Sequence, residues 1–346
     1  MDLYSPAELI ALVDFTEPQP YYWLERAFNE NVFAKGEEIV FDDIIEDVRI
    51  APFVVPVNNG KPIVHQGYNS RTFKPAYIKL ADPIRPEQLS KRPPGAPINA
   101  PVDRVAQLRA ARVNRLGQHR ASILKRLEWM AWQYMLYGKY TVSGEGYPTV
   151  LVDFGRDVNN TVTLAGADLW SAPSSATPLT DFEDWSNQIL KTAGVAGRLV
   201  TMSVEAYQAA KATTQWKEEY TNFKSNGGSI PDTSPKLASR VQYIGKYGQF
   251  DIEIVNTTYK DEAGTEQRYM PAGKVIMSAP GPDALGGMKA FGRIQHMKAV
   301  ELGDPMVDVF AYEFPSVDGS AINMGAESAP LLVGKRVNAA LTATVI

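Results

Sequence analysis

Proline divides this chain into two regions that must fold differently. Ten of its 24 prolines lie from Pro52 to Pro101, and none lies between Pro101 and Pro148. Proline has a fixed φ and no backbone N–H, so it interrupts helices and the interiors of sheets. We therefore expect extended chain in the first region, whereas the second region can form a long helix.

The proline-free region has the pattern of a long helix. Its apolar residues recur at nearly helical spacing, and most of the basic residues lie between them. Asp103 can cap its start, Gly138 is suited to its end, and Gly117 is a point at which the helix could divide. A continuous helix would be about 50 Å long, which indicates an elongated subunit. The apolar positions are Val105, Leu108, Val113, Leu116, Ile123, Leu127, Met130, Tyr134 and Tyr137.

The proline-rich region indicates an arm that projects from the body. Two apolar segments, 51–57 and 61–68, flank Asn58-Asn59-Gly60, and Asn-Gly favours a tight turn. A third extended segment covers 73–80, and the prolines are incompatible with central strands. Such an arm has little core of its own, so it needs a neighbour for stability. The tip of the arm is either at 58–60 or nearer 66–71.

The second half mixes helices and strands, so the predicted class is α+β. We expect helices over 181–193 and 203–223, a strand over 197–202, a hairpin of 249–259 with 265–277, and a final strand over 337–345.

Charge is concentrated in two segments of opposite sign. Residues 1–50 hold 12 acids and 3 bases, and residues 85–126 hold 10 bases and 2 acids. Each segment therefore either contacts opposite charge, between or within subunits, or forms a solvated face. A third alternative is that the basic helix faces nucleic acid. The candidate inter-subunit contacts are Glu37, Glu38, Asp42, Asp43, Arg104, Arg109, Arg112 and Arg115.

The composition excludes several classes of protein. The chain has 346 residues, a net charge of -4 and no cysteine, so disulfides and thiolate chemistry are excluded. The net charge disfavours a dedicated nucleic-acid binder. The N-terminal MDLYSPAELI has no basic start and no apolar stretch, so we expect no signal peptide. No apolar run approaches 18 residues, so we expect no membrane-spanning segment.

The residues that usually carry catalysis are scattered. The three histidines, His65, His119 and His296, match no metal-binding spacing, and the glycine-rich stretches match no phosphate loop. The aromatic cluster of Tyr21, Tyr22, Trp23 and Phe28 has few bases around it, so it favours docking over base stacking. We therefore expect no catalytic, cofactor-binding or metal-binding residue. An elongated chain with complementary charged segments is typical of a self-assembling protein.

Several strings resemble the lambda-like major capsid protein family of tailed bacteriophages. They run in family order along nearly the whole chain, and the match is poorest over about 165–245. The strings are YSPAELI (4–10), VPVNNG (55–60), FKPAYIK (73–79), GKYTVSGE (138–145), VDFGRDVNNTVT (152–163), YGQFDIEIV (247–255), LGDP (302–305) and SAPLLV (328–333).

The resemblance implies the capsid fold of tailed phages and herpesviruses, the Hong Kong phage type. It implies an N-terminal arm at 1–35, the start of the peripheral domain at 36–50 and an extended loop at 51–98. The peripheral domain with its spine helix would cover 99–167, the axial domain 168–310, and C-terminal strands returning to the peripheral domain 311–346.

The resemblance also implies a structural function. Copies would form hexamers and pentamers of an icosahedral shell around packaged double-stranded DNA, within a virion assembled in the host cytoplasm. Scaffolding, portal and decoration proteins are the implied partners, with DNA contacted non-specifically and no membrane or cofactor involved. The alternatives are an encapsulin-like cargo shell, a phage tail structural protein or, from a different class, a soluble α+β enzyme.

Overall fold

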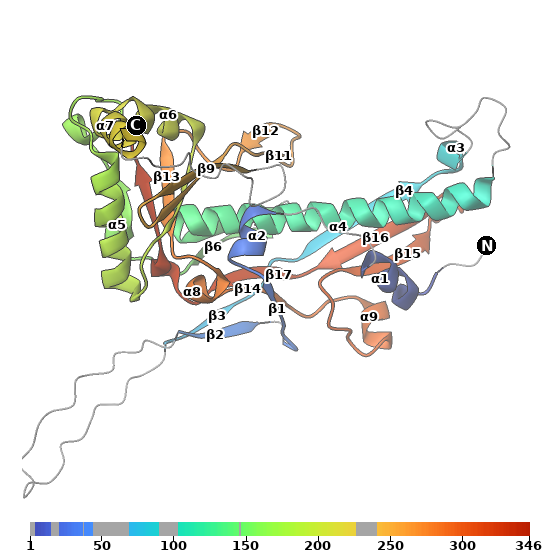
Figure 1. Cartoon of the computed structure of the whole chain (residues 1–346). Helices are drawn as coiled ribbons and strands as arrows, with labels where there is room; N and C mark the ends of the chain where they lie inside the picture. The colour runs from blue at the N-terminus through green and yellow to red at the C-terminus, as the bar shows by residue number, and fades with distance from the viewer. Residues whose placement is uncertain are drawn as a thin grey trace, which may run out of the picture.

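A computed structural model describes residues 4–14, 21–36, 38–43, 69–89, 103–144, 147–225 and 241–346. Figure 1 shows an elongated molecule crossed by one long helix. The predicted turn at 58–60, the rest of 51–68, and Glu37 lie outside the described residues.

The long helix is α4, Arg104–Tyr137, of 34 residues or about 51 Å. Asp103 accepts hydrogen bonds from the backbone N–H of Val105 and Ala106, as its position predicted. Gly138 ends the helix with φ 66°, which confirms the predicted stop. The helix continues through Gly117, because one glycine costs only about 1 kcal/mol and buried residues on either side anchor the helix.

Two three-stranded sheets pack along α4. One has the order β15 (Phe310–Pro315), β16 (Ile322–Ser328) and β4 (Ile78–Ile84), all antiparallel. The other has the order β1 (Glu30–Phe33), β14 (Gly287–Phe291) and β17 (Pro330–Gly334). Together with α1 (Pro6–Asp14) and α2 (Tyr22–Arg26), they bury α4 at Leu116, Leu127 and Trp132.

A six-stranded sheet stands at the C-terminal end of α4 (Figure 1). Helices α5 (Pro178–Ala193) and α6 (Val204–Ala212) pack on it around Phe182 and Ile189, and α7 (Thr214–Ser225) lies beside them. The strand order is β7 (Thr161–Thr163), β18 (Ala340–Thr344), β13 (Lys274–Ser278), β8 (Leu199–Met202), β10 (Phe250–Val255) and β9 (Val241–Tyr247).

The remaining elements are short. Three hairpins are formed by β2 (Ile39–Asp43) with β3 (Asn69–Phe73), β5 (Lys139–Gly144) with β6 (Tyr147–Asp153), and β11 (Thr258–Lys260) with β12 (Glu266–Arg268). The short helices are α3 (Pro86–Leu89), α8 (Pro282–Leu285) and α9 (Met297–Glu301), and single helical turns cover Val158–Asn160, Gly166–Asp168 and Val337–Ala339. The mixture of helical and sheet layers is that of an α+β protein, as predicted.

The structure corrects three local predictions. The helix predicted over 203–223 is divided at Thr213, whose ψ of 152° ends α6 and whose hydroxyl oxygen accepts from the N–H of Trp216. The predicted hairpin of 249–259 with 265–277 is confined to β11 and β12, because β8 lies between β10 and β13. The helix predicted from 181 begins at Pro178.

The boundary expected at 310/311 does not coincide with a boundary between sheets. Strands β15 to β17 lie beside α4, but β18 pairs with β13 and β7 in the six-stranded sheet. The reason is the apolar alternation of β18, which buries Leu341 and Ala343 in the core under α5.

The end of α4 gives a prediction about glycine. Gly138 lies under Arg156, which donates to the carbonyl oxygens of Met135 and Tyr134, and a Cβ on Gly138 would lie 2.6 Å from the Arg156 Cβ. Gly194 ends α5 with φ 70° and has open space around it. We expect Gly194→Ala to cost about 1–2 kcal/mol of unfolding free energy.

Gly138→Ala carries the same backbone strain plus the overlap, so we expect it to cost about 1–3 kcal/mol more. Urea unfolding of the two purified variants measures the difference. Equal losses of unfolding free energy in the two variants would contradict the predicted overlap between a Cβ at position 138 and the side chain of Arg156.

Candidate functional site

A buried carboxylate joins the N-terminal segment to the long helix. Glu128 of α4 is 2% exposed and accepts hydrogen bonds from the backbone N–H of Trp23 and Leu24, both at 3.1 Å. It also accepts from Trp132 Nε1 at 2.8 Å. The carboxylate thereby caps α2, whose first N–H groups have no partner in the helix itself. Burial raises the pKa of Glu128 to about 7, despite these three donors.

A second network ties α2 to the six-stranded sheet. Arg26 pairs with Glu253 of β10 at 2.8 Å, and the Tyr22 hydroxyl donates to the same carboxylate at 2.8 Å. Tyr22 also lies 2.7 Å from the hydroxyl of Thr201 in β8. Burial raises the pKa of Tyr22, so its hydroxyl remains a hydrogen-bond donor. Helix α2 is therefore fixed to both α4 and the sheet.

A third network fixes the first residues of the described chain. Arg112 of α4 is 4% exposed and pairs with Glu313 of β15, with Nε and Oε2 3.0 Å apart. The guanidinium lies over the ring of Tyr4, whose backbone N–H donates to Glu313. Arg112, one of the predicted inter-subunit contacts, thus has a charge partner within its own chain.

The other predicted contact residues are more exposed. Arg104 and Arg109 are exposed, and Arg115 is half-buried and donates to Gln118 at 3.3 Å. Among the described residues, none of these three makes an ion pair with a carboxylate. Glu38 is exposed, and the backbones of Asp42 and Asp43 pair with Ser70 and Asn69 in the β2–β3 hairpin. The described structure brings no predicted acid to a predicted base, so the contact stays a prediction.

The sequence reasoning missed the buried acids that hold the subunit together. Glu128, Glu253, Glu313 and Glu327 are each at most 2% exposed. Glu327 accepts from the hydroxyls of Tyr77 and Tyr312 and pairs with Lys79 at 2.8 Å. Their signal was an acid flanked by apolar residues, as at Glu253 in FDIEIV and Glu313 in FAYEFP, because an acid at a position that faces the core needs buried donors.

The described histidines have structural contacts. His119 Nε2 lies 2.9 Å from a carboxylate oxygen of Asp82, and His296 Nδ1 accepts from the N–H of Lys298 at the start of α9. His65 lies outside the described residues. Within the described ranges, no three acidic or histidine side chains come together as a metal site. No helix in that part of the chain is long and apolar enough to cross a membrane.

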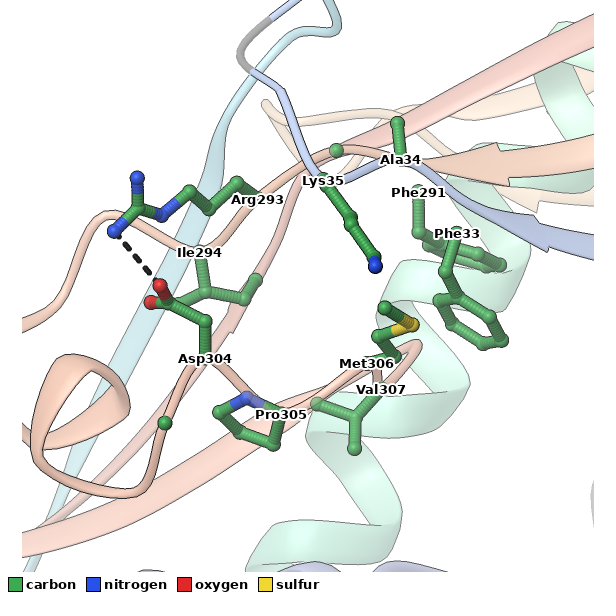
Figure 2. A pocket seen from close by; sticks show the side chains of 12 residues that line it. Phe33, Ala34, Lys35, Phe291, Arg293, Ile294, Asp304, Pro305, Met306 and Val307 are labelled. Carbon is green, nitrogen blue, oxygen red and sulfur yellow. Dashed lines mark ion pairs between the residues drawn. The ribbon is translucent and has the colours of Figure 1, made fainter.

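A cavity of about 340 Å³ lies where β1 and β14 end. Figure 2 shows Phe33, Phe291, Met306 and Val307 beside the amine of Lys35, and Arg293 pairs with Asp304 at 2.7 Å on the other side. Neither histidine of the described chain lines it. The arrangement has apolar walls on one side, the single amine of Lys35, and the ion pair of Arg293 with Asp304 on the other side.

The sequence and the fold are similar to those of phage capsid proteins. The sequence model of the family described as phage major capsid protein E matches residues 5–345. The chain is 27% identical to the major capsid protein of Enterobacteria phage P21 over 340 residues, which cover 96% of each chain. It is 24% identical to the major capsid protein of Escherichia phage lambda over 305 residues, which cover 88% of this chain and 87% of the relative.

Solved structures give the same result for the fold. A capsid protein from a prophage of Escherichia coli CFT073 superposes with a TM-score of 0.73 at 18% identity and covers 100% of both chains. A phage-related protein from Bordetella bronchiseptica RB50 superposes with a TM-score of 0.53 at 12% identity, covering 99% of this chain and 98% of that one.

Glu128 predicts how stability depends on pH. Because burial raises its pKa from 4.5 to about 7, the folded chain holds the proton more tightly than the unfolded chain does. This contribution is complete below about pH 4.5 and is lost as pH rises through about 7. Between pH 5 and pH 8, the wild type should lose about 2–3 kcal/mol relative to Glu128→Gln, which cannot ionise.

Urea unfolding at several pH values measures this difference. Glu25→Gln, at an exposed position of α2, is the matched control and should follow the wild type. A Glu128→Gln variant whose stability follows the wild type at every pH would contradict the assignment.

Proposed function

The chain belongs to the phage major capsid protein E family, and we propose that its copies join as hexamers and pentamers into an icosahedral phage head around double-stranded DNA. Proteins of this family are structural, so the chain is a shell-forming component of the virion and is not an enzyme. The fold is that of phage capsid proteins, as the resemblance implied. The single observation that carries the proposal is the family match over residues 5–345.

The internal networks support a subunit that keeps its shape while it makes repeated contacts. Glu128, Glu253 and Glu313 each join the N-terminal segment to an element more than 100 positions away. Removing one partner of such a buried group costs about 3–5 kcal/mol, so these contacts resist rearrangement. A shell needs this property, because an error in the shape of one subunit is repeated at every interface.

The described elements support a division into the parts of a capsid subunit. Helix α4 and its two three-stranded sheets correspond to the peripheral domain, and the six-stranded sheet with α5, α6 and α7 corresponds to the axial domain. We place β7 and β18 in the axial domain, because both are strands of that sheet. The β2–β3 hairpin is then the base of the extended loop.

We further propose the partners that the chain contacts during assembly and in the finished shell. Arg104, Arg109 and Arg115 lie on a helix segment with no acid between Asp103 and Glu128, so this segment attracts an anionic partner. The favoured partner is the acidic stretch that includes Glu37, Glu38, Asp42 and Asp43 on another copy, and packaged DNA is the rival. Scaffolding, portal and decoration proteins complete the proposal, with assembly in the host cytoplasm.

The proposal predicts that the chain forms closed shells when a scaffolding protein is present. Expression with a scaffolding protein from the same phage should give particles that sediment far ahead of free subunits. Electron microscopy should show icosahedral shells with six-fold and five-fold clusters. Tubes, or discrete small oligomers under all assembly conditions, would contradict the proposal.

Charge reversal tests the contact of the basic helix. Each exposed ion pair contributes about 0–1 kcal/mol. Arg104→Glu, Arg109→Glu and Arg115→Glu together should therefore raise the concentration needed for assembly about ten- to a hundredfold. Reversal of Glu37, Glu38, Asp42 and Asp43 to Lys should restore assembly if these acids are the partner.

The charge-matched control is Lys139→Glu, Lys191→Glu and Lys211→Glu, at exposed positions on other elements. Normal assembly of empty shells with reduced retention of DNA would assign the basic helix to DNA. If the triple arginine variant affected neither step, the basic residues would form only a solvated face.

A further inference from the structure

Four large apolar side chains are exposed on α9 and the loop that follows it. Met297 is 73% exposed and Met306 is 54% exposed, and Val300 and Leu302 are exposed as well. Figure 1 shows α9 at the edge of the molecule, away from α4. Apolar side chains that gather at one place on a surface mark a contact with another molecule. We call these four residues, together with the cavity that Met306 lines, the α9 surface.

The α9 surface is held in place by the chain itself. Three successive backbone N–H groups, from Leu302 to Asp304, donate to carbonyl oxygens of α9 at 2.8 to 3.3 Å. The amine of Lys298 donates to the carbonyl oxygen of Glu313 in β15 at 2.9 Å, and Ala299 is buried in the core beneath the helix. The exposed side chains therefore have a fixed position before any partner binds.

The cavity of about 340 Å³ lies directly beside these exposed side chains. The loop after α9 lines one side of it with Gly303–Val307. Figure 2 shows the rings of Phe33 and Phe291 across the cavity from Asp304. Protruding apolar side chains and an apolar cavity are thus neighbours on one surface. Two copies of such a surface can bind each other, because a side chain of each copy can enter the cavity of the other.

Two charged side chains flank the cavity from different elements. Lys35, which follows β1, lines the cavity on the side of Phe33, and Glu301 ends α9 just before the loop on the other side. Both are exposed, and neither makes an ion pair with another described residue. The neighbouring Arg293 and Asp304 neutralise each other at 2.7 Å. The α9 surface therefore has an amine on one side of its cavity and a carboxylate on the other.

We infer that the α9 surface binds the same surface of a second copy of this chain about a two-fold axis. Met297 of each copy enters the cavity of the other copy, and Glu301 of each copy pairs with Lys35 of the other. Each contact forms twice, because each surface carries both halves of it. The inference rests on the proposed function, because it names one contact between copies in the shell.

The charges favour a second copy over other partners. An apolar partner would bury Lys35 and Glu301 without opposite charges, which is unfavourable. An acidic partner would attract Lys35 and repel Glu301, and a basic partner would do the reverse. A second copy offers an opposite charge to both side chains and also fills the cavity.

Exchange of the two charges tests the pairing. Lys35→Glu or Glu301→Lys brings like charges together twice in each contact, so either variant should raise the concentration needed for shell assembly about three- to thirtyfold. The double variant Lys35→Glu, Glu301→Lys restores both pairs, so it should assemble like the wild type. The matched control is Lys35→Glu, Glu183→Lys, which has the same net charge but changes an exposed acid of α5 instead.

The control should remain impaired. Equal assembly of the two double variants, or no effect of either single variant, would overturn the pairing. If the wild type itself forms no shells, it is the proposed function that fails, and crosslinking in a concentrated solution of the free chain then tests the contact.

Cysteine crosslinking tests the two-fold arrangement. The natural chain has no cysteine, so every crosslink reports the introduced residues. Met297→Cys is mixed with Met306→Cys carrying a size tag, and a short bifunctional thiol reagent should join the two chains. Leu302→Cys lies between α9 and the cavity, near the axis, and should crosslink to the same residue of a second copy. Val158→Cys, at a position 82% exposed on another element, is the control and should not be joined to Met306→Cys.

The reactivity of Met297→Cys toward a thiol reagent shows what covers the surface. This cysteine should react readily in free subunits and lose most of its reactivity in shells. Protection already present in free subunits would mean that the same chain covers the surface, and full reactivity in complete shells would mean that nothing covers it. Protection in shells without either crosslink would assign the surface to a different partner. Each of these three results would overturn the inference.

Discussion

The long helix α4 is the constraint on which the rest of the structure depends. A helix within a folded protein is stabilised mainly by packing of its apolar face, so α4 needs cover along most of its length of about 51 Å. No single sequence segment does this. The N-terminal half is covered by α1 and the sheet of β4, β15 and β16, and the C-terminal half by α2, β1, β14 and β17. The distant parts of the chain are brought together by this shared surface.

Buried acids then determine how the N-terminal segment lies on that surface. Apolar packing alone tolerates small shifts, whereas a buried carboxylate needs its donors at hydrogen-bond distance. Glu128 accepts from the backbone of α2, Glu253 pairs with Arg26, and Glu313 pairs with Arg112. These groups add little net stability, because desolvation offsets much of their attraction. Because a shifted segment would leave these carboxylates buried without donors, they favour the observed position of the N-terminal segment over slightly shifted positions.

The subunit therefore separates two uses of charge. Acids in its interior are paired within the chain, and cations such as Arg104 and Arg109 stay exposed on α4. Interior pairs define the shape of one copy, whereas Arg104 and Arg109 make no ion pair with a carboxylate of the described residues. The outer edge of β4 is also unoccupied, since no described strand pairs with β4 on the side away from β16.

The sequence alone determined the features that depend on neighbours within a few residues. The distribution of prolines separated the helix from the arm, and Asp103 and Gly138 marked the two ends of α4. The ordered strings also identified the family. Predictions from local sequence failed at two places. The hairpin of 249–259 with 265–277 was wrong because β8 lies between β10 and β13, and the single helix over 203–223 was wrong because Thr213 divides α6 from α7.

Only the tertiary structure decided which charges meet. Arg112 was expected to meet opposite charge between or within subunits, and within this chain it lies 3.0 Å from Glu313, a residue 201 positions later. Glu128 had no signal beyond being one acid in a buried helix face, and its two backbone donors, Trp23 and Leu24, are more than 100 positions earlier. Electrostatic attraction depends on distance in space and on burial, and a short stretch of sequence determines neither quantity. The distances and the burial of these pairs are set only when distant segments pack on α4.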